Sequence, residues 1–181
     1  MNEFETYEYV IGQKKTGAVK LRRLLLVVMY IGFAFVMLSL AMLIPASAAI
    51  VSLTPFGLAL LVFLTWRYTS VEYEYSVTSG EVTVSKIYGG RSRRVVAEFR
   101  LRDCSMIAPA WDRLWKEKAE AFGASSSVKA LSVSDAPDAY FAAYETREGE
   151  KGIVYFEATQ KMLRICHFYN ASATVLTKVS R

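Results

Sequence analysis

Two long runs without a charged residue stand next to each other near the start of the chain. The first covers Leu24–Ile44 and the second Ala46–Trp66, each 21 residues long, and only Pro45 separates them. At about 1.5 Å of rise per residue, a helix made from either run crosses the roughly 30 Å hydrocarbon core of a bilayer. Because backbone exposed to lipid must form its hydrogen bonds within each helix, the pair predicts a transmembrane helical hairpin that bends at Pro45.

The small residues Ala46-Ser47-Ala48 leave a second interpretation open, in which this point is the cleavage site of a secretion signal. The apolar region of a signal peptide is usually about 7 to 15 residues long, which is shorter than the first run. A second run of similar length also follows directly. We therefore favour the hairpin, whereas cleavage would export everything after this site.

The flanking charges predict the orientation of the hairpin. Five cations precede the first run, one follows the second and none lies in the bend: Lys14, Lys15, Lys20, Arg22, Arg23 and Arg67. By the positive-inside rule both chain ends are cytoplasmic, and we expect a multi-pass protein of the cell membrane. The expected anchors at the membrane interface are Arg22, Arg23, Trp66, Arg67 and Tyr68. Neither run contains an ionisable residue, which disfavours a transporter or channel.

The hairpin divides the chain into three expected parts. These are a cytoplasmic N-terminal segment (1–23), the hairpin (24–66, with helices 24–44 and 46–66) and a cytoplasmic β-rich domain (67–181). The net charge of +5 is the sum of 6 − 3 = +3 up to Arg67 and 16 − 14 = +2 beyond it. A nucleic-acid-binding domain usually concentrates excess basic charge on a folded face, so we expect no nucleic-acid partner.

Beyond Arg67, apolar and polar residues alternate, which indicates half-buried strands. The first three strands are expected at 71–78, 82–88 and 94–101, and the turns Ser79-Gly80 and Gly89-Gly90 join them into an antiparallel meander. Further strands are expected at 128–133, 140–146 and 153–158, with one more edge strand at 174–179. The N-terminal stretch Glu3–Ile11 alternates in part and could add an edge strand, lie at the membrane interface or be disordered; the sequence does not choose among these.

Two short amphipathic helices are expected in the same domain. One runs from Asp112, a suitable N-cap, to Phe122, and Gly123 follows its end. Thr159 caps the second, which continues to about Tyr169. Trp111 and Trp115 are expected to pack on the sheet. A helix after six or seven antiparallel strands can plug an open barrel or cover a bent sheet.

The order of these elements resembles a group of small bacterial membrane proteins. The similarity rests on the short polar N-terminus, the transmembrane hairpin, the juxtamembrane strand pair VEYEYSVTSGEVTVSKI and the strand-to-helix junction GIVYFEATQKMLRI. The cytoplasmic part of these proteins is similar to bacterial pleckstrin-homology-like domains. The resemblance implies an α+β membrane protein, in which the transmembrane hairpin precedes a mostly antiparallel β, pleckstrin-homology-like domain that has a C-terminal helix. The helix at 112–122 is a departure from the simple pleckstrin-homology pattern.

Four cations surround the second predicted turn: Lys86, Arg91, Arg93 and Arg94. Arginine forks bind phosphate through paired hydrogen bonds, and an anionic leaflet attracts each nearby cation by about 1 kcal/mol. These residues are candidate contacts for anionic lipid headgroups such as phosphatidylglycerol or cardiolipin. The alternative is a solvated hairpin tip whose charges keep an exposed sheet edge from pairing with other chains.

The sequence shows no catalytic, cofactor-binding or metal-ligating pattern. Cys104 and Cys166 are far apart in sequence and are expected to be reduced thiols in or near the core. The neighbouring His167 would point elsewhere on a helix, which argues against a Cys-His nucleophile. Asn170-Ala-Ser172 matches a glycosylation acceptor, but the expected cytoplasmic location makes the match a chance one.

These observations favour a non-enzymatic, membrane-anchored scaffold or interaction module at the cytoplasmic face. Its expected partners are the lipid bilayer and an unidentified membrane protein or a second copy of the chain. The alternative function is binding of anionic lipid headgroups by the basic hairpin tip.

Overall fold

The protein is described here by a computed structural model, in which residues 6–13, 17–45, 47–146 and 148–180 are described. These residues divide into two compact units. One unit contains the two apolar helices and the hairpin tip Tyr88–Ser92, and the other contains the sheets and two shorter helices.

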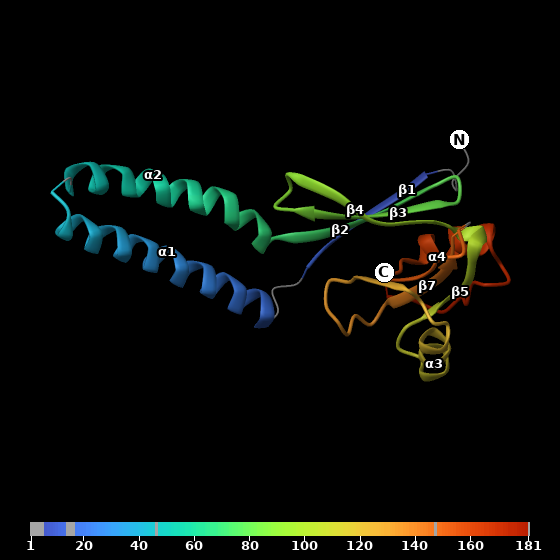
Figure 1. The fold of residues 1–181 in the computed structure, drawn as a ribbon. Helices are drawn as coiled ribbons and strands as arrows, with labels where there is room; N and C mark the ends of the chain where they lie inside the picture. Colours follow the sequence, from blue (N-terminus) through green and yellow to red (C-terminus); the bar gives the residue numbers. More distant parts are fainter. Residues whose placement is uncertain (1–5, 14–16, 46, 147, 181) are drawn as a thin grey trace. The chain divides into compact units, whose positions relative to one another are not determined.

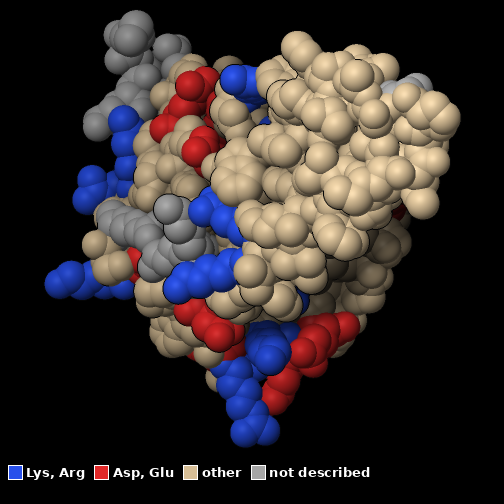
Figure 2. Space-filling view, turned by 90° about the vertical axis from the view of Figure 1, so that its left-hand side faces the viewer, with Lys and Arg blue, Asp and Glu red and all other residues tan. Residues whose placement is uncertain are grey.

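The apolar unit consists of helices α1 (Gly17–Leu43) and α2 (Ser47–Trp66), which lie side by side (Figure 1). A hydrogen bond of 2.6 Å joins the hydroxyl groups of Tyr30 and Thr65 between them. Both helices are long and apolar enough to cross a membrane. Figure 2 views the molecule from the end that contains the bend, and there the surface of the two helices is tan, the colour of uncharged residues. The short 3-10 helix η1 (Arg67–Thr69) follows α2 directly.

Four strands form the first sheet in the order β1-β2-β3-β4. They are β1 (Thr6–Gly12), β2 (Val71–Thr78), β3 (Glu81–Tyr88) and β4 (Ser92–Arg100). The predicted meander is therefore present, and β1 extends it by pairing antiparallel with β2, Tyr9 opposite Tyr75. Of the three alternatives for the N-terminal stretch, the edge strand is the one that the structure contains.

The second sheet has the order β5-β7-β8-β6. Its strands are β5 (Cys104–Pro109), β6 (Ser126–Ala130), β7 (Ala139–Glu145) and β8 (Lys151–Glu157). Two expectations were wrong here. No strand was expected at β5, because its run CSMIAP lacks polar alternation, and β6 pairs parallel with β8 instead of antiparallel.

Buried aromatic side chains pack the two sheets against each other. Tyr75 of β2 is fully buried, its ring lies edge-on to Phe156 of β8 at 6.2 Å, and its hydroxyl donates to the Ala130 carbonyl. Phe99 of β4 stacks on Tyr144 of β7 with ring centroids 4.7 Å apart. Burying one such ring contributes about 2 to 3 kcal/mol, so these contacts supply much of the core stability.

Both predicted short helices are present with the predicted caps. The carboxylate of Asp112 accepts the Leu114 amide at the start of α3 (Arg113–Ala121), and the Thr159 hydroxyl accepts the Met162 amide at the start of α4 (Gln160–Tyr169). Each cap contributes about 1 kcal/mol. Ala119 of α3 belongs to a buried cluster with Phe141 of β7.

Two further expectations in this unit were wrong. The tail at 174–179 is no strand: it forms one isolated parallel bridge, between Thr174 and Ile107 of β5. Asn170 ends α4 and turns the tail toward β5, so the tail covers that edge without a regular ladder. Trp115 packs on the sheet as expected, whereas Trp111 is 62% exposed because it precedes the helix and lies beyond the covered face.

Candidate functional site

The hairpin tip Tyr88–Ser92, which contains Arg91, belongs to the same compact unit as the apolar helices. Its Gly89 amide donates to the Ser70 carbonyl at 2.8 Å, just after the end of η1. The Gly89 backbone has a φ of +57°, and a Cβ atom added there would lie 3.1 Å from Cα of Arg67. A glycine is therefore required at this point for the tip to approach the base of α2 so closely.

Aromatic and cationic side chains surround this contact. The Arg91 guanidinium lies 5.4 Å from the ring centroid of Phe63, within the last turns of α2. Arg67 donates to the Tyr68 hydroxyl at 2.9 Å, and the Tyr68 ring lies edge-on to Tyr88 at 5.5 Å. The attraction between a cation and the face of an aromatic ring contributes about 0.5 to 1 kcal/mol at exposed sites. The tip is thus held by ring contacts as well as by its backbone.

Arg23, near the start of α1, reaches the same end of the helix pair. Its Nη2 atom donates to the Thr69 carbonyl of η1 at 3.4 Å. Its Nε atom is buried and has no hydrogen-bond partner among the described residues. A buried N–H group without an acceptor costs free energy, and an acceptor that reached it would recover that cost. The Arg23 guanidinium therefore has a donor available for an anionic oxygen. We call Arg23, Arg67, Tyr68, Tyr88 and Arg91 the helix-base cluster.

The remaining predicted lipid contacts are arranged differently. Arg93 forms an ion pair with the buried Glu74 at 2.8 Å and donates to the Ser85 hydroxyl at 3.1 Å. Lys86 lies over the Tyr73 ring at 5.9 Å. Arg94 is exposed. The four cations therefore do not form one set: Arg91 belongs to the helix-base cluster, while Arg93 stabilises the sheet.

Of the predicted interface anchors, Arg22 and Arg23 lie in the second turn of α1, and Trp66, Arg67 and Tyr68 lie at the end of α2 and in η1. Trp66 and Tyr68 are 45% and 38% exposed, and Arg22 is also exposed. The sequence does not predict that Phe63 and Tyr88 belong to this site, nor that Gly89 approaches the base of α2. The Gly-Gly pair indicated a turn, but no local signal indicates which other segment that turn contacts. Whether any of these residues binds lipid stays a prediction.

The two thiols show no sign of activation. Both are buried and free, and burial raises the pKa of Cys166 to about 12 and that of Cys104 well above its ordinary value. Both groups therefore remain protonated near neutral pH. Because the thiolate is the form that acts as a nucleophile or a metal ligand, neither thiol is activated. Within the described residues, no three His, Cys, Asp or Glu side chains come together as a metal site would require.

The family comparison matches nearly the whole chain. The bacterial PH-like domain family (DUF6106) matches residues 4–175. The chain belongs to this family. No curated protein and no solved structure matches it.

This PH-like protein therefore has the predicted fold class: an α+β chain in which two apolar helices accompany mostly antiparallel sheets and a C-terminal helix. The match covers the helices as well as the sheets. PH-like domains are generally non-catalytic, and together with the two apolar helices the match indicates a membrane-associated interaction module.

Proposed function

We propose that this protein is a non-enzymatic module that a two-helix transmembrane hairpin holds at the cytoplasmic face of the cell membrane, where its β-rich domain, expected over residues 67–181, binds another protein. The charges support the orientation, because the cations flank the two helices and the bend has none. The observation that carries the proposal is the helix-base cluster. Its tyrosines and arginines lie at the helix ends, where aromatic and basic residues mark a membrane interface.

Reporter fusions and crosslinking in cells test this proposal together. A phosphatase fused after Ala49 is expected to be active, and one fused after Arg181 inactive, because only the bend reaches the outside. Crosslinking in intact cells is expected to give a discrete adduct of the full chain, with another protein or with itself. An active phosphatase at the C-terminal end would disprove the orientation. The lack of any adduct would contradict the interaction function.

A second candidate function is the binding of anionic headgroups by the helix-base cluster. Two arginines favour this function. Arg91 lies over the Phe63 ring of α2, and Arg23 has a buried N–H group without an acceptor in the described chain. A lipid phosphate can accept from such guanidinium groups. Lys86, Arg93 and Arg94 contribute less directly, since Arg93 is already paired with Glu74.

The Arg91→Ala variant of the full chain tests this second function. In detergent micelles doped with phosphatidylglycerol, native mass spectrometry is expected to show about fivefold weaker retention of that lipid, equivalent to about 1 kcal/mol for one interfacial cation. Arg113→Ala is the matched control, because the Arg113 side chain is 91% exposed on α3. Equal retention by the wild type and both variants would exclude headgroup binding at this cluster.

A further inference from the structure

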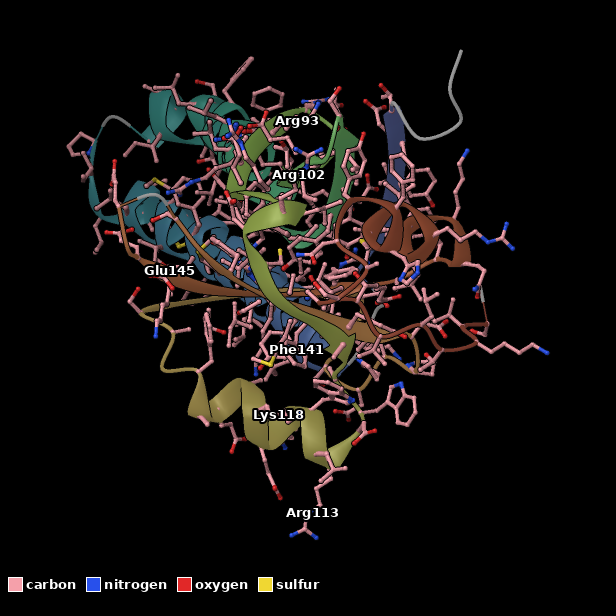
Figure 3. All side chains as sticks on the ribbon, turned by 90° about the vertical axis from the view of Figure 1, so that its right-hand side faces the viewer. Arg93, Arg102, Arg113, Lys118, Phe141 and Glu145 are labelled. Carbon is pink, nitrogen blue, oxygen red and sulfur yellow. The ribbon has the colours of Figure 1, made fainter. Side chains whose placement is uncertain are left out.

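A cleft of about 440 Å³ lies beside α3 in the β-rich unit. The side chains that matter for its chemistry are Trp111, Lys116, Lys129, Leu131, Asp135 and Tyr155. They come from the approach to α3, from α3 itself, from β6 and the loop after it, and from β8. Figure 3 shows α3 across one face of the second sheet, with Arg113 pointing away from that sheet.

The apolar part of the cleft is open to a partner. Leu131 belongs to a small buried cluster against which Tyr155 packs, and Trp111 is 62% exposed. Large apolar side chains that gather at a concave, exposed place mark interaction sites, and tryptophan is the residue type most enriched where binding energy concentrates.

The charges in the cleft favour an acidic occupant. Among the side chains that line the cleft, Lys116 and Lys129 contribute two positive charges against the one negative charge of Asp135; Glu120 of α3 adds a negative charge near Tyr155 but does not line the cleft. The Lys129 ammonium lies 5.9 Å from the centroid of the Tyr155 ring. An acidic side chain that entered here would meet a cation directly beside the apolar surface, which favours anionic segments and repels basic ones.

The adjacent strand favours a polypeptide over a small molecule. β6 ends the sheet, and no strand of the described chain pairs with its outer edge. Its last carbonyl, that of Ala130, already accepts the Tyr75 hydroxyl. The open edge therefore covers Ser126 to Lys129, and Lys129 also lines the cleft. An extended peptide can add to such an edge through its backbone and place a side chain in the neighbouring pocket.

We propose that this cleft is the partner-binding site of the module, and that it binds an extended acidic peptide segment whose single apolar side chain lies between Trp111 and Tyr155. This inference rests on the proposed function, because it names the surface and the partner class through which the module would act. The segment pairs with the edge of β6 while its carboxylates face Lys116 and Lys129.

The test uses the full chain in nanodiscs and a displayed library of random twelve-residue peptides. The selected peptides are expected to share acidic residues around one aromatic or aliphatic residue. A synthetic peptide of that consensus is then titrated against variants. Trp111→Ser and Lys129→Glu are each expected to weaken its binding at least about tenfold, the loss typical of a central interface residue. Unchanged thermal unfolding of both variants checks that they are folded.

Matched controls use exposed residues outside the cleft. Phe168→Ser removes an exposed aromatic of α4, and Lys178→Glu reverses an exposed charge of the tail; both are expected to bind the peptide normally. A basic consensus, no consensus, or equal binding by all variants overturns the inference. So does quenching of tryptophan fluorescence by spin-labelled lipid that the Trp111→Ser variant loses, which would mean that the cleft faces the bilayer. If the crosslinked adduct in cells persists in the two cleft variants, only this inference fails and the interaction function stands.

Discussion

Replacing Asn170 by aspartate is expected to lower the free energy of unfolding by about 4 kcal/mol, because two carbonyl groups lose their donors and face a carboxylate. The Asn170 Nδ2 group donates to the carbonyls of Leu101 and Cys104, both at 2.8 Å. Its Oδ1 atom accepts the Ala173 amide at 3.2 Å. One side chain therefore holds the end of α4, the start of β5 and the tail together.

Urea unfolding of the Asn170→Asp chain in detergent micelles measures this loss. Acid is expected to restore part of it. Repulsion by the two carbonyls raises the pKa of the introduced carboxyl group in the folded state. The loss of unfolding free energy is therefore complete at a pH above this raised pKa, and it shrinks as the pH falls toward about 4, the ordinary pKa of aspartate. Ser172→Ala is the control: it removes only an exposed hydrogen bond to Asn170 and should change stability by less than about 0.5 kcal/mol. A loss of similar size in both variants would contradict this role of Asn170.

The same contacts explain the glycosylation motif. Asn170-Ala-Ser172 matches an acceptor sequence, but both N–H groups of the amide already donate to backbone carbonyls inside the fold. A motif of three residues contains no information about such distant partners. The motif is better explained by the turn it forms at the end of α4 than by a modification.

Features with local causes could be predicted from the sequence. The apolar runs predicted α1 and α2 because length and lack of charge alone determine whether a helix can cross a bilayer. Asp112 and Thr159 predicted the starts of α3 and α4 because a cap acts within one helical turn. The β-turn pairs Ser79-Gly80 and Gly89-Gly90 predicted the meander, since positive φ angles suit glycine.

Features with distant causes could not be predicted. The parallel pairing of β6 with β8 depends on α3, which lies between β5 and β6 in the chain and brings β6 to the far edge of the sheet. β5 has no alternation because Ile107 and Ala108 are both fully buried, as residues of a covered strand are. The tail beside β5 is positioned by Asn170 at its start and by partners far away in the sequence, among them Tyr140 and Asp138.

The candidate site was predicted only in part, for the same reason. The sequence placed four cations around one turn, which is a local observation. It could not distinguish Arg93, whose charge is matched by Glu74 on β2, from Arg91, which lies over Phe63 of α2. Both differences depend on which strand or helix lies opposite. A cluster of charges near a turn therefore indicates a binding surface only once it is known which residues lie opposite each cation.

Replacing Gly89 by valine is expected to release the hairpin tip from the base of α2. A β-branched residue at a φ of +57° is strained by about 1 to 2 kcal/mol, and its Cβ atom would lie 3.1 Å from both Cα and Cβ of Arg67. The tip must move away to relieve this contact, and it then loses the hydrogen bond from Gly89 to the Ser70 carbonyl. We expect a total cost of about 3 kcal/mol, with a tip that opens far more often than in the wild type.

Gly90→Val is a matched control, because Gly90 also has a positive φ, +67°, but an added Cβ atom would have nothing within 4 Å. The difference between the two variants therefore isolates the contact with Arg67. Limited trypsin digestion of the full chain in micelles measures it, since Arg91 lies in the tip. Cleavage after Arg91 is expected to be about tenfold faster in Gly89→Val than in Gly90→Val, equivalent to about 1.4 kcal/mol of additional local opening. Retention of phosphatidylglycerol should decrease with it if Arg91 binds headgroups only while it lies against Phe63. Equal cleavage rates would mean that backbone strain alone controls the tip and that its approach to α2 does not stabilise it.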